Sequence, residues 1–401
     1  MQDSAIISEN IYIDEENIWF TEFNYNALCK INKRNKCVKL IGVFPEEKII
    51  QRSLYTSIVM YKNKMYFAPY SAHEIGVYDV NDNKFEKIKV DLPSKKNCLE
   101  WEKGKFLKAV ELRDKIWFIP YYYPGILCYE INTGKCFCFD DWVDIIERKR
   151  AGKWGYFMDV EVAGNKLILP CACSDAVVIF DVLTGKSKVI LTSSTKYQCK
   201  YCGIINVNNI FYLISADGMI YKRRLEKEQE EITKIKLPVS VTDEIAFYPV
   251  QYMNGYIYMF PYQKNKGIKI NTKTDFVEDE FLLNTKENNF SDTAFYLTSI
   301  IDNKKLYATS VINKEFIEFD FLNRKKRGGK LFFSEQDRDI IHEKIKKELG
   351  DKILHECIIE KEEKYLNILM NILKKDKDLK INASDINKGT EIYYKLSEKL
   401  V

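Results

Sequence analysis

Hydrophobic and aromatic residues occur along this chain in short runs that alternate with polar turns. Between Phe106 and Asp140 four such runs follow one another, AVEL, IWFIP, ILCYEI and KCFCF, separated by turn-forming residues such as Asn132-Thr133-Gly134. β-Branched and aromatic side chains favour strands, whereas Gly, Pro, Asn and Asp favour turns. This stretch therefore predicts one antiparallel sheet of four short strands.

The same pattern recurs seven times. The centre of the predicted second strand returns at intervals of 43 to 51 residues, at Trp19, Tyr66, Trp117, Ile168, Phe211, Tyr258 and Tyr307. A position in the third strand returns at intervals of 42 to 51 residues, at Ile31, Asp79, Glu130, Asp181, Arg223, Ile270 and Asp320. An aromatic residue opens the innermost strand of every repeat but the first, which has Ser8 there: Tyr55, Phe106, Phe157, Tyr201, Phe247 and Tyr296. Periods of about 40 to 50 residues with four strands each are typical of propeller blades, so the sequence predicts an all-β fold, a seven-bladed β-propeller of four-stranded antiparallel blades.

The pattern changes at Ser334, which divides the chain into a predicted propeller (1–333) and a helical C-terminal region (334–401). Ser334 is placed to cap a helix that ends at Gly350, and two more helical stretches follow at 351–375 and from near Ser384. We interpret this appendage as a cap packed on the propeller or as a partner-binding module. A helical turn is expected within Asp141–Arg150, and Ser4–Ile7 is expected to complete the sheet of the last blade, which removes an exposed edge.

Charge balance and cysteine content restrict the expected partners and the expected cellular compartment. The 62 basic and 58 acidic side chains nearly balance, at a net charge of +4, and the short basic run 324–327 is interpreted as a solvated turn, so no nucleic-acid partner is expected. We find no signal-peptide pattern and no apolar run long enough to span a membrane. The eleven cysteines are an odd number, and several fall inside apolar strands, among them Cys29, Cys128, Cys136 and Cys138. Buried free thiols behave as small hydrophobic groups, so a reducing, cytoplasmic setting is expected.

Residues for metal or acid–base chemistry are few. Of the three histidines, His73 lies in a predicted propeller loop, and His342 and His355 lie in the tail. No Ser/His/Asp triad or histidine-rich metal site can be built from them, and no glycine-rich phosphate loop is present, so neither metal nor cofactor is expected. The spacings Cys136-x-Cys138, Cys171-x-Cys173 and Cys199-x-x-Cys202 are typical of metal or redox motifs, but alternation along a strand puts both sulfurs of a CxC on one face, which packing alone explains.

Aromatic residues gather in the loops on one predicted face of the propeller. These are the loops that follow the second strands and the loops that connect blades, and Pro-Tyr occurs in three of them, at Pro69-Tyr70, Pro120-Tyr121 and Pro261-Tyr262. The connecting loops add Trp101, Trp142, Trp154 and Tyr156. Tyr and Trp present a broad apolar face and a polar tip, which suits sugars or peptide segments. The competing interpretation is that these rings seal the junctions between blades.

Charges in the innermost strands point to the same sector. Lys108, Glu111, Asp159 and Glu161 lie in blades three and four, whereas the innermost strands of blades two, five, six and seven carry no charge. A buried charge needs a partner, so these residues form either a structural Lys108–Asp159 bridge or a grip on a polar ligand. The candidate ligand-binding residues are therefore Tyr70, His73, Trp101, Lys108, Tyr121, Tyr122, Trp154, Asp159 and Tyr262.

The blade consensus, [IM]-[WY]-F-x-P-Y followed by a third strand ending in V-Y-D-V-N, resembles Kelch-type propellers. Tyr66 with Tyr78-Asp79 and Trp117 with Tyr129-Glu130 carry the resemblance, and the Gly-Gly doublet of Kelch repeats is absent. The whole chain resembles bacterial Kelch-like β-propeller proteins of uncharacterised function with a short helical tail, some of which accompany glycan-assembly genes.

Together these features predict a non-enzymatic cytoplasmic binding or scaffold protein that holds a glycan, peptide or protein partner on its aromatic loop face, with the helical tail as a further candidate for an interaction. The alternative is a propeller enzyme, a lyase or hydrolase on a carbohydrate-like substrate, with Asp159 and Glu161 as its catalytic carboxylates.

Overall fold

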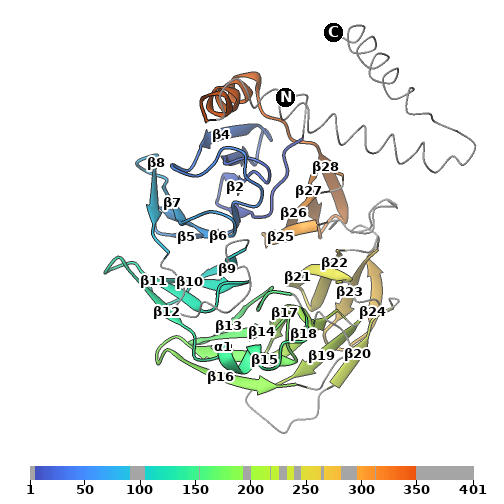
Figure 1. Ribbon diagram of the computed structural model, residues 1–401. Coiled ribbons are helices and arrows are strands. Elements are labelled where there is room, and N and C mark those ends of the chain that lie inside the picture. The colour runs from blue at the N-terminus through green and yellow to red at the C-terminus, as the bar shows by residue number, and fades with distance from the viewer. Residues whose placement is uncertain are drawn as a thin grey trace, which may run out of the picture. The chain divides into compact units, whose positions relative to one another are not determined.

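The fold is a ring of seven four-stranded antiparallel sheets (Figure 1). The computed structural model describes residues 5–90, 104–152, 154–192, 200–216, 218–224, 233–238, 245–262, 266–280, 296–311 and 313–348. In each sheet the strands lie in chain order, so every blade is a simple meander. The predicted all-β, seven-bladed propeller is confirmed.

The strands of the first four blades are β1 (Tyr12–Ile13), β2 (Asn17–Thr21), β3 (Leu28–Asn32) and β4 (Val38–Gly42); β5 (Tyr55–Tyr61), β6 (Lys64–Pro69), β7 (Ile75–Asp79) and β8 (Lys84–Ile88); β9 (Phe106–Glu111), β10 (Lys115–Pro120), β11 (Ile126–Glu130) and β12 (Lys135–Phe139); β13 (Glu161–Ala163), β14 (Lys166–Pro170), β15 (Ala176–Asp181) and β16 (Lys186–Leu191). Those of the last three blades are β17 (Tyr201–Val207), β18 (Ile210–Ser215), β19 (Met219–Arg223) and β20 (Thr233–Lys236); β21 (Phe247–Met253), β22 (Tyr256–Pro261), β23 (Gly267–Asn271) and β24 (Val277–Glu280); β25 (Tyr296–Asp302), β26 (Lys305–Ser310), β27 (Glu315–Asp320) and β28 (Lys325–Gly329).

The core lies between neighbouring blades, and the second strands supply much of it. Strand β10 is buried from Ile116 to Pro120, whereas the outermost strand β12 is largely exposed. Trp117 in β10 packs against Phe180 of blade four, with ring centroids 5.4 Å apart. Aromatic pairs at this separation add to the area they bury, which explains why an aromatic residue returns at this position in most repeats.

The innermost strands line the centre of the ring, and each contacts a neighbouring blade, as β5 does β9 and β21 does β25. Side chains satisfy the backbone groups that these strand edges would leave unpaired. Ser57 Oγ accepts from the Ala109 N–H at 3.1 Å, and Gln251 Nε2 donates to the Ser299 carbonyl at 3.0 Å. At the centre of the ring, hydrogen bonds made by individual side chains thus link neighbouring innermost strands.

The N-terminal segment closes the ring differently from the sequence expectation. All four strands of the last blade come from its own meander, β25 to β28. Residues 5–7, the described part of the expected Ser4–Ile7 segment, form no strand in that sheet, so the expectation is wrong for these residues. Instead the Ile6 N–H donates to the Leu331 carbonyl at 2.8 Å, and Thr309 Oγ1 donates to the Ser8 carbonyl at 2.5 Å. The seam between the last and first blades is therefore held by isolated hydrogen bonds.

Two helical segments match the sequence. Helix α1 (Val143–Glu147) is the helical turn expected in the loop between blades three and four. Residues 335–348 form a helix, and Ser334 Oγ accepts from the Asp337 N–H at 3.1 Å, as the N-cap prediction requires. The two further helical stretches of the tail lie outside the described residues. Within the residues that are described, no helix is both long and apolar enough to cross a membrane.

Candidate functional site

A repeated backbone hydrogen bond shapes the loop that follows each second strand. In six blades the N–H of a residue in this loop donates to the carbonyl of the residue directly before the innermost-strand marker of the same blade, over 2.7 to 3.2 Å. The donors are Phe23, Tyr70, Tyr121, Ala172, Ala216 and Tyr262. Because the bond fixes the donor beside the opening of the innermost strand, the loops after the second strands and the starts of the innermost strands share one face. The tyrosines of all three Pro-Tyr pairs occupy this donor position.

A cavity of about 150 Å³ opens where these positions converge. Its lining comes from six of the seven blades, which places it at the mouth of the central channel. The lining residues are Glu9, Ser53, Thr56, Tyr70, Leu107, Lys108, Tyr121, Trp154, Met158, Tyr248, Tyr262 and Leu297. Five of the nine candidate ligand-binding residues are among them: Tyr70, Lys108, Tyr121, Trp154 and Tyr262.

Aromatic rings form the walls of this cavity. The rings of Tyr70 and Tyr121 lie 6.0 Å apart, and those of Tyr248 and Tyr262 also lie 6.0 Å apart. Tyr122 does not line the cavity but packs against Tyr121, with ring centroids 4.4 Å apart. Trp154 is partly buried, so part of its indole is open to a ligand.

Lys108 and Asp159 form the predicted bridge between blades three and four. Lys108 Nζ lies 3.8 Å from Asp159 Oδ1, and the ammonium also lies over the Tyr248 ring, 5.6 Å from its centroid. Asp159 Oδ2 accepts from the Ile204 N–H at 3.3 Å. Burial raises the pKa of Asp159, and the positive charge of Lys108 offsets part of that rise. Lys108 thus lines the cavity, whereas Asp159 pairs with Lys108 and is not among the lining residues.

Glu161 continues this line of carboxylates down the channel. Its Oε1 accepts from the Asn206 N–H at 3.1 Å. Burial raises the pKa of Glu161 to about 7, and the neighbouring charge of Asp159 adds to the effect. Both carboxylates therefore hold backbone groups of β17, which is a structural task. The fourth predicted channel charge, Glu111, is exposed and accepts from the Asp114 N–H at 3.2 Å.

Charge near the channel mouth is not confined to blades three and four, which corrects the sequence interpretation. Glu9, from blade one, also lines the cavity. Its Oε1 accepts from Ser53 Oγ at 3.0 Å, and its Oε2 is buried without a hydrogen-bond partner among the described residues. Burial raises the pKa of Glu9 to about 7; the Ser53 hydrogen bond lowers it and the charge of Glu22 raises it further.

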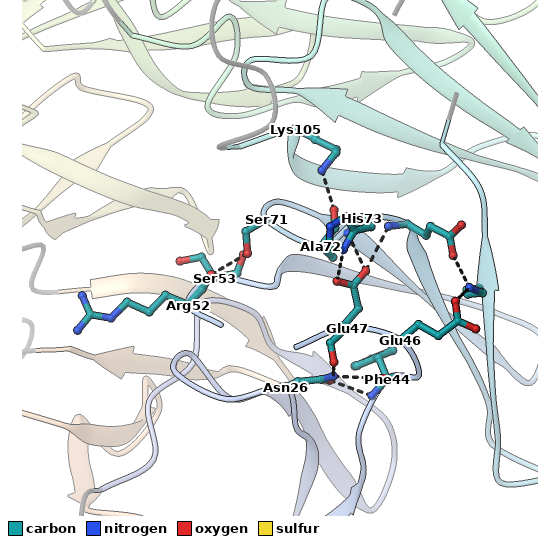
Figure 2. Close-up of polar contacts among 12 residues, drawn as sticks. Asn26, Phe44, Glu46, Glu47, Arg52, Ser53, Ser71, Ala72, His73 and Lys105 are labelled. Carbon is teal, nitrogen blue, oxygen red and sulfur yellow. Dashed lines mark hydrogen bonds and ion pairs between the residues drawn. The ribbon is translucent and has the colours of Figure 1, made fainter. Parts of the chain in front are cut away.

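His73 is not among the residues that line the aromatic cavity, and Figure 2 shows it beside Glu47. Its backbone N–H donates to Glu47 Oε1 at 2.6 Å, and its Nδ1 lies 2.9 Å from Glu47 Oε2. The imidazole lines a separate cavity of about 300 Å³ together with Glu46, Glu74 and Lys87. In the same view Lys105 Nζ donates to the Ala72 carbonyl at 2.7 Å. Glu47 and Lys105 thus hold the loop that follows Tyr70.

The remaining tryptophans that the structure describes serve packing. Trp142 and Tyr156 are fully buried, with ring centroids 4.9 Å apart, so the interpretation of loop aromatics as junction seals is correct for this pair. Tyr156 also donates to Glu147 Oε1 at 2.5 Å, which ties α1 to the loop. Trp101, another candidate, lies outside the described residues.

The cysteine spacings do not assemble a metal centre among the described residues, where no three His, Cys, Asp or Glu side chains gather suitably. Cys171 and Cys173 are buried in the apolar core between blades three and four. Cys138 is exposed on the outermost strand β12 rather than buried in an apolar strand, which corrects the expectation for that residue. Cys199 of the third spacing lies outside the described residues.

A larger cavity, of about 830 Å³, lies between blades four and five. It is lined by Gly164, Thr184 and Asn209, which belong to turns joining first to second and third to fourth strands. These turns lie on the face opposite the aromatic cavity. Among the described residues that line this groove there is no tryptophan or tyrosine, and Lys166, Lys186 and Lys188 give it a basic edge.

Sequence reasoning missed Glu9 and Tyr248, although a signal for both exists. The residue directly after each innermost-strand marker reads Glu9, Thr56, Leu107, Met158, Cys202, Tyr248 and Leu297. All of these except Cys202 line the cavity, so this single position of the repeat forms its floor. Extending the marker series to Ser8 in the first repeat points to Glu9 at once.

The comparisons with known proteins show the fold alone. No protein-family model and no curated protein matches the chain. Among solved structures, the computationally designed Ika8 protein is similar at a TM-score of 0.53 and 9% identity, over 84% of this chain and 90% of that one. Sqt1 of Saccharomyces cerevisiae is similar at 0.53 and 11% identity, over 81% and 86%. A chain in a structure of the mitotic checkpoint complex is similar at 0.52 and 9% identity, over 83% and 91%. These similarities support the propeller fold, and the number of blades is given by the seven sheets of this chain itself.

Proposed function

We propose that this protein is a non-enzymatic binding or scaffold protein that holds a glycan, peptide or protein partner at the aromatic mouth of its propeller channel. The observation that carries the proposal is the convergence of Tyr70, Tyr121, Trp154 and Tyr262, from separate loops, on one cavity. Convergent rings with a few polar groups are the usual composition of ligand sites. We take the bacterial Kelch-like assignment from the resemblance of the blade consensus, and the cytoplasmic setting from the buried free cysteines.

The energetics favour a site of moderate affinity. Stacking of a sugar ring or peptide segment on Trp154 would bury on the order of 100 Å² of apolar area, worth roughly 2 kcal/mol. Lys108 would orient a polar group of the ligand more than strengthen its binding. Asp159 already compensates the charge of the Lys108 ammonium, and desolvation of this ammonium offsets most of the Coulomb gain.

The first prediction tests the site directly. The purified protein is screened on glycan and peptide arrays, and the hits are titrated by isothermal calorimetry. We expect Trp154→Ala to weaken binding about tenfold or more, because it removes the stacking surface. Lys108→Met should chiefly broaden specificity.

The matched control is Leu183→Ala, a truncation on the opposite face at a side chain that is 65% exposed. It should leave the affinity unchanged. Undiminished binding by Trp154→Ala would return this residue to a packing role. Binding that instead depends on Lys166 would move the site to the groove between blades four and five.

An enzyme is the second candidate, favoured by one observation. Glu161 has a pKa of about 7 beside a second carboxylate, Asp159, which is the arrangement of an acid–base pair. Against it stands the structural task of both groups, which accept backbone N–H bonds from blade five. Asp159→Asn combined with Glu161→Gln distinguishes the two: an enzyme loses turnover of the array hit, whereas a binder shows no turnover before or after the change.

A further inference from the structure

We propose that the cavity at the channel mouth receives a protonated amine of its ligand, which the carboxylate of Glu9 binds between the aromatic walls. This inference rests on the proposed function and narrows the chemistry of the ligand. Its first support is the pattern of the cavity floor. Of the seven residues that directly follow the innermost-strand markers, Glu9 alone carries a charge.

The second support is an unfilled hydrogen-bonding capacity. Glu9 Oε1 accepts from Ser53 Oγ, but Oε2 is buried and has no donor among the described residues. A buried oxygen without a partner costs free energy, and an ionised one costs more. An ammonium group supplies both the missing donors and the compensating charge.

The third support is the aromatic lining of the cavity. Five aromatic side chains line it: Tyr70, Tyr121, Trp154, Tyr248 and Tyr262. The faces of aromatic rings carry partial negative charge and attract cations within about 6 Å. A carboxylate at the base of an aromatic enclosure therefore favours an ammonium group over a neutral ligand of the same shape.

The charges around Glu9 leave room for an added cation. No Lys, Arg or His among the described residues forms an ion pair with it. Glu22, the carboxylate nearest in effect, accepts from the N–H groups of Asn24 and Tyr25. Lys108, the cation of the cavity, lies beside Asp159. The described carboxylates in and around the cavity, Glu9, Glu22 and Asp159, thus outnumber Lys108, the described cation that lines it.

The test compares amine probes with matched neutral ones. The peptide arm uses an acetylated and amidated Gly-Lys-Gly against the same peptide with norleucine in place of lysine. The sugar arm uses a trimer of β-1,4-linked glucosamine against its N-acetylated form. Each is titrated by isothermal calorimetry against the full chain and against Glu9→Gln, with Glu16→Gln, an exposed carboxylate of blade one, as the charge-matched control.

We expect at least one amine probe to bind about tenfold more tightly than its neutral match, and Glu9→Gln to abolish that preference while Glu16→Gln keeps it. The arm that responds identifies the source of the amine. Between about pH 6 and about pH 8 the lysine peptide should gain about tenfold in affinity as Glu9 ionises, since its own amine stays protonated.

Equal affinity for amine and neutral probes, or an amine preference that survives Glu9→Gln, overturns the inference. So does the failure of both amine probes to bind. A neutral probe that binds in a Trp154-dependent way leaves the proposed function standing while this inference falls. Loss of the Trp154 dependence overturns the proposed site as well.

Discussion

At the scale of single residues, two glycines determine where the wall tyrosines lie. Gly104 and Gly155 each stand two residues before the innermost-strand marker of the next blade. A Cβ at Gly104 would come within 2.6 Å of Tyr70 Cζ, and one at Gly155 within 2.4 Å of Tyr121 Cδ2. Real Cβ atoms do not approach other atoms so closely, so a tyrosine of one blade can pack on the loop of the next only because a glycine lies there.

Gly104→Ala should therefore displace the Tyr70 ring and weaken binding at the channel mouth several-fold. The three atoms nearest to such a Cβ all belong to the Tyr70 side chain, and the free energy of unfolding should fall by roughly 1 to 3 kcal/mol, as over-packing usually costs. Gly329→Ala is the control, because its Cβ meets no atom within 4 Å. Ligand titration and thermal melts of both variants check this, and unchanged affinity in Gly104→Ala would show that Tyr70 takes no part in binding.

Buried Glu9 should also make the stability depend on pH. Its pKa is raised from 4.5 to about 7, so the folded state holds a proton that the unfolded chain releases. The stabilisation is fully present below about pH 4.5 and is lost as the pH rises through 7, by roughly 1 to 3 kcal/mol. Glu9→Gln should thus match the wild-type melting temperature near pH 5 and exceed it near pH 8. A difference between the two proteins that does not change with pH would contradict this.

The sequence predicted the aromatic part of the site better than its charged part. Pro-Tyr pairs at Tyr70, Tyr121 and Tyr262 were recognisable because the propeller repeat brings equivalent loops together. Glu9 was missed because the marker of its blade is a serine, so the position after it was not compared with the others. His73 shows the opposite limit. Its loop was right, but the hydrogen bonds to Glu47 that direct it elsewhere depend on a residue of the preceding connection.

At the scale of elements, strand identity followed from periodicity, while strand ends followed from contacts that the sequence does not display. The centre of every second strand was recognised because these strands are buried along nearly their whole length. Innermost strand β13 spans only Glu161–Ala163, whereas β17 runs over Tyr201–Val207. In blade four the ladder between β13 and β14 covers only three residue pairs, and an isolated bridge joins Phe157 to Cys171 before it. Asp159, between Phe157 and β13, bonds to the next blade instead.

The tail offers a prediction at this scale, since we propose that residues 334–401 form a separable helical region. A chain ending at Phe333 should remain soluble and give a circular dichroism spectrum dominated by β-structure, because every strand of the seven described sheets ends before that residue. The helical signal should fall relative to the full chain. Failure of the shortened chain to fold would make the tail part of the propeller core.

At the scale of the whole molecule, ring closure converts a linear repeat into one shared site. Glu9 and Leu297 are far apart along the chain yet line the same cavity. The repeat interval predicts this meeting, because equivalent positions of a closed ring must converge at its axis. The repeat does not determine which amino acid stands at each of those positions. The architecture was therefore predictable, whereas the ligand class was not.

The manner of closure leaves the first and last blades without a shared strand ladder. Neighbouring strands inside a blade share a full ladder of hydrogen bonds, whereas the first and last blades meet through contacts such as Ile6–Leu331, Thr309–Ser8 and the Lys33–Asp302 ion pair. Among the described residues, the N-terminal segment adds no strand to the last blade, so no interlocked clasp is seen there. Opening of this seam would separate blade one, and Glu9 with it, from Leu297 of the neighbouring last blade. Glu9, the carboxylate that we propose to bind an amine, thus lies beside the seam between the first and last blades. A ligand held there by Glu9 would contact both blades and stabilise the closed ring.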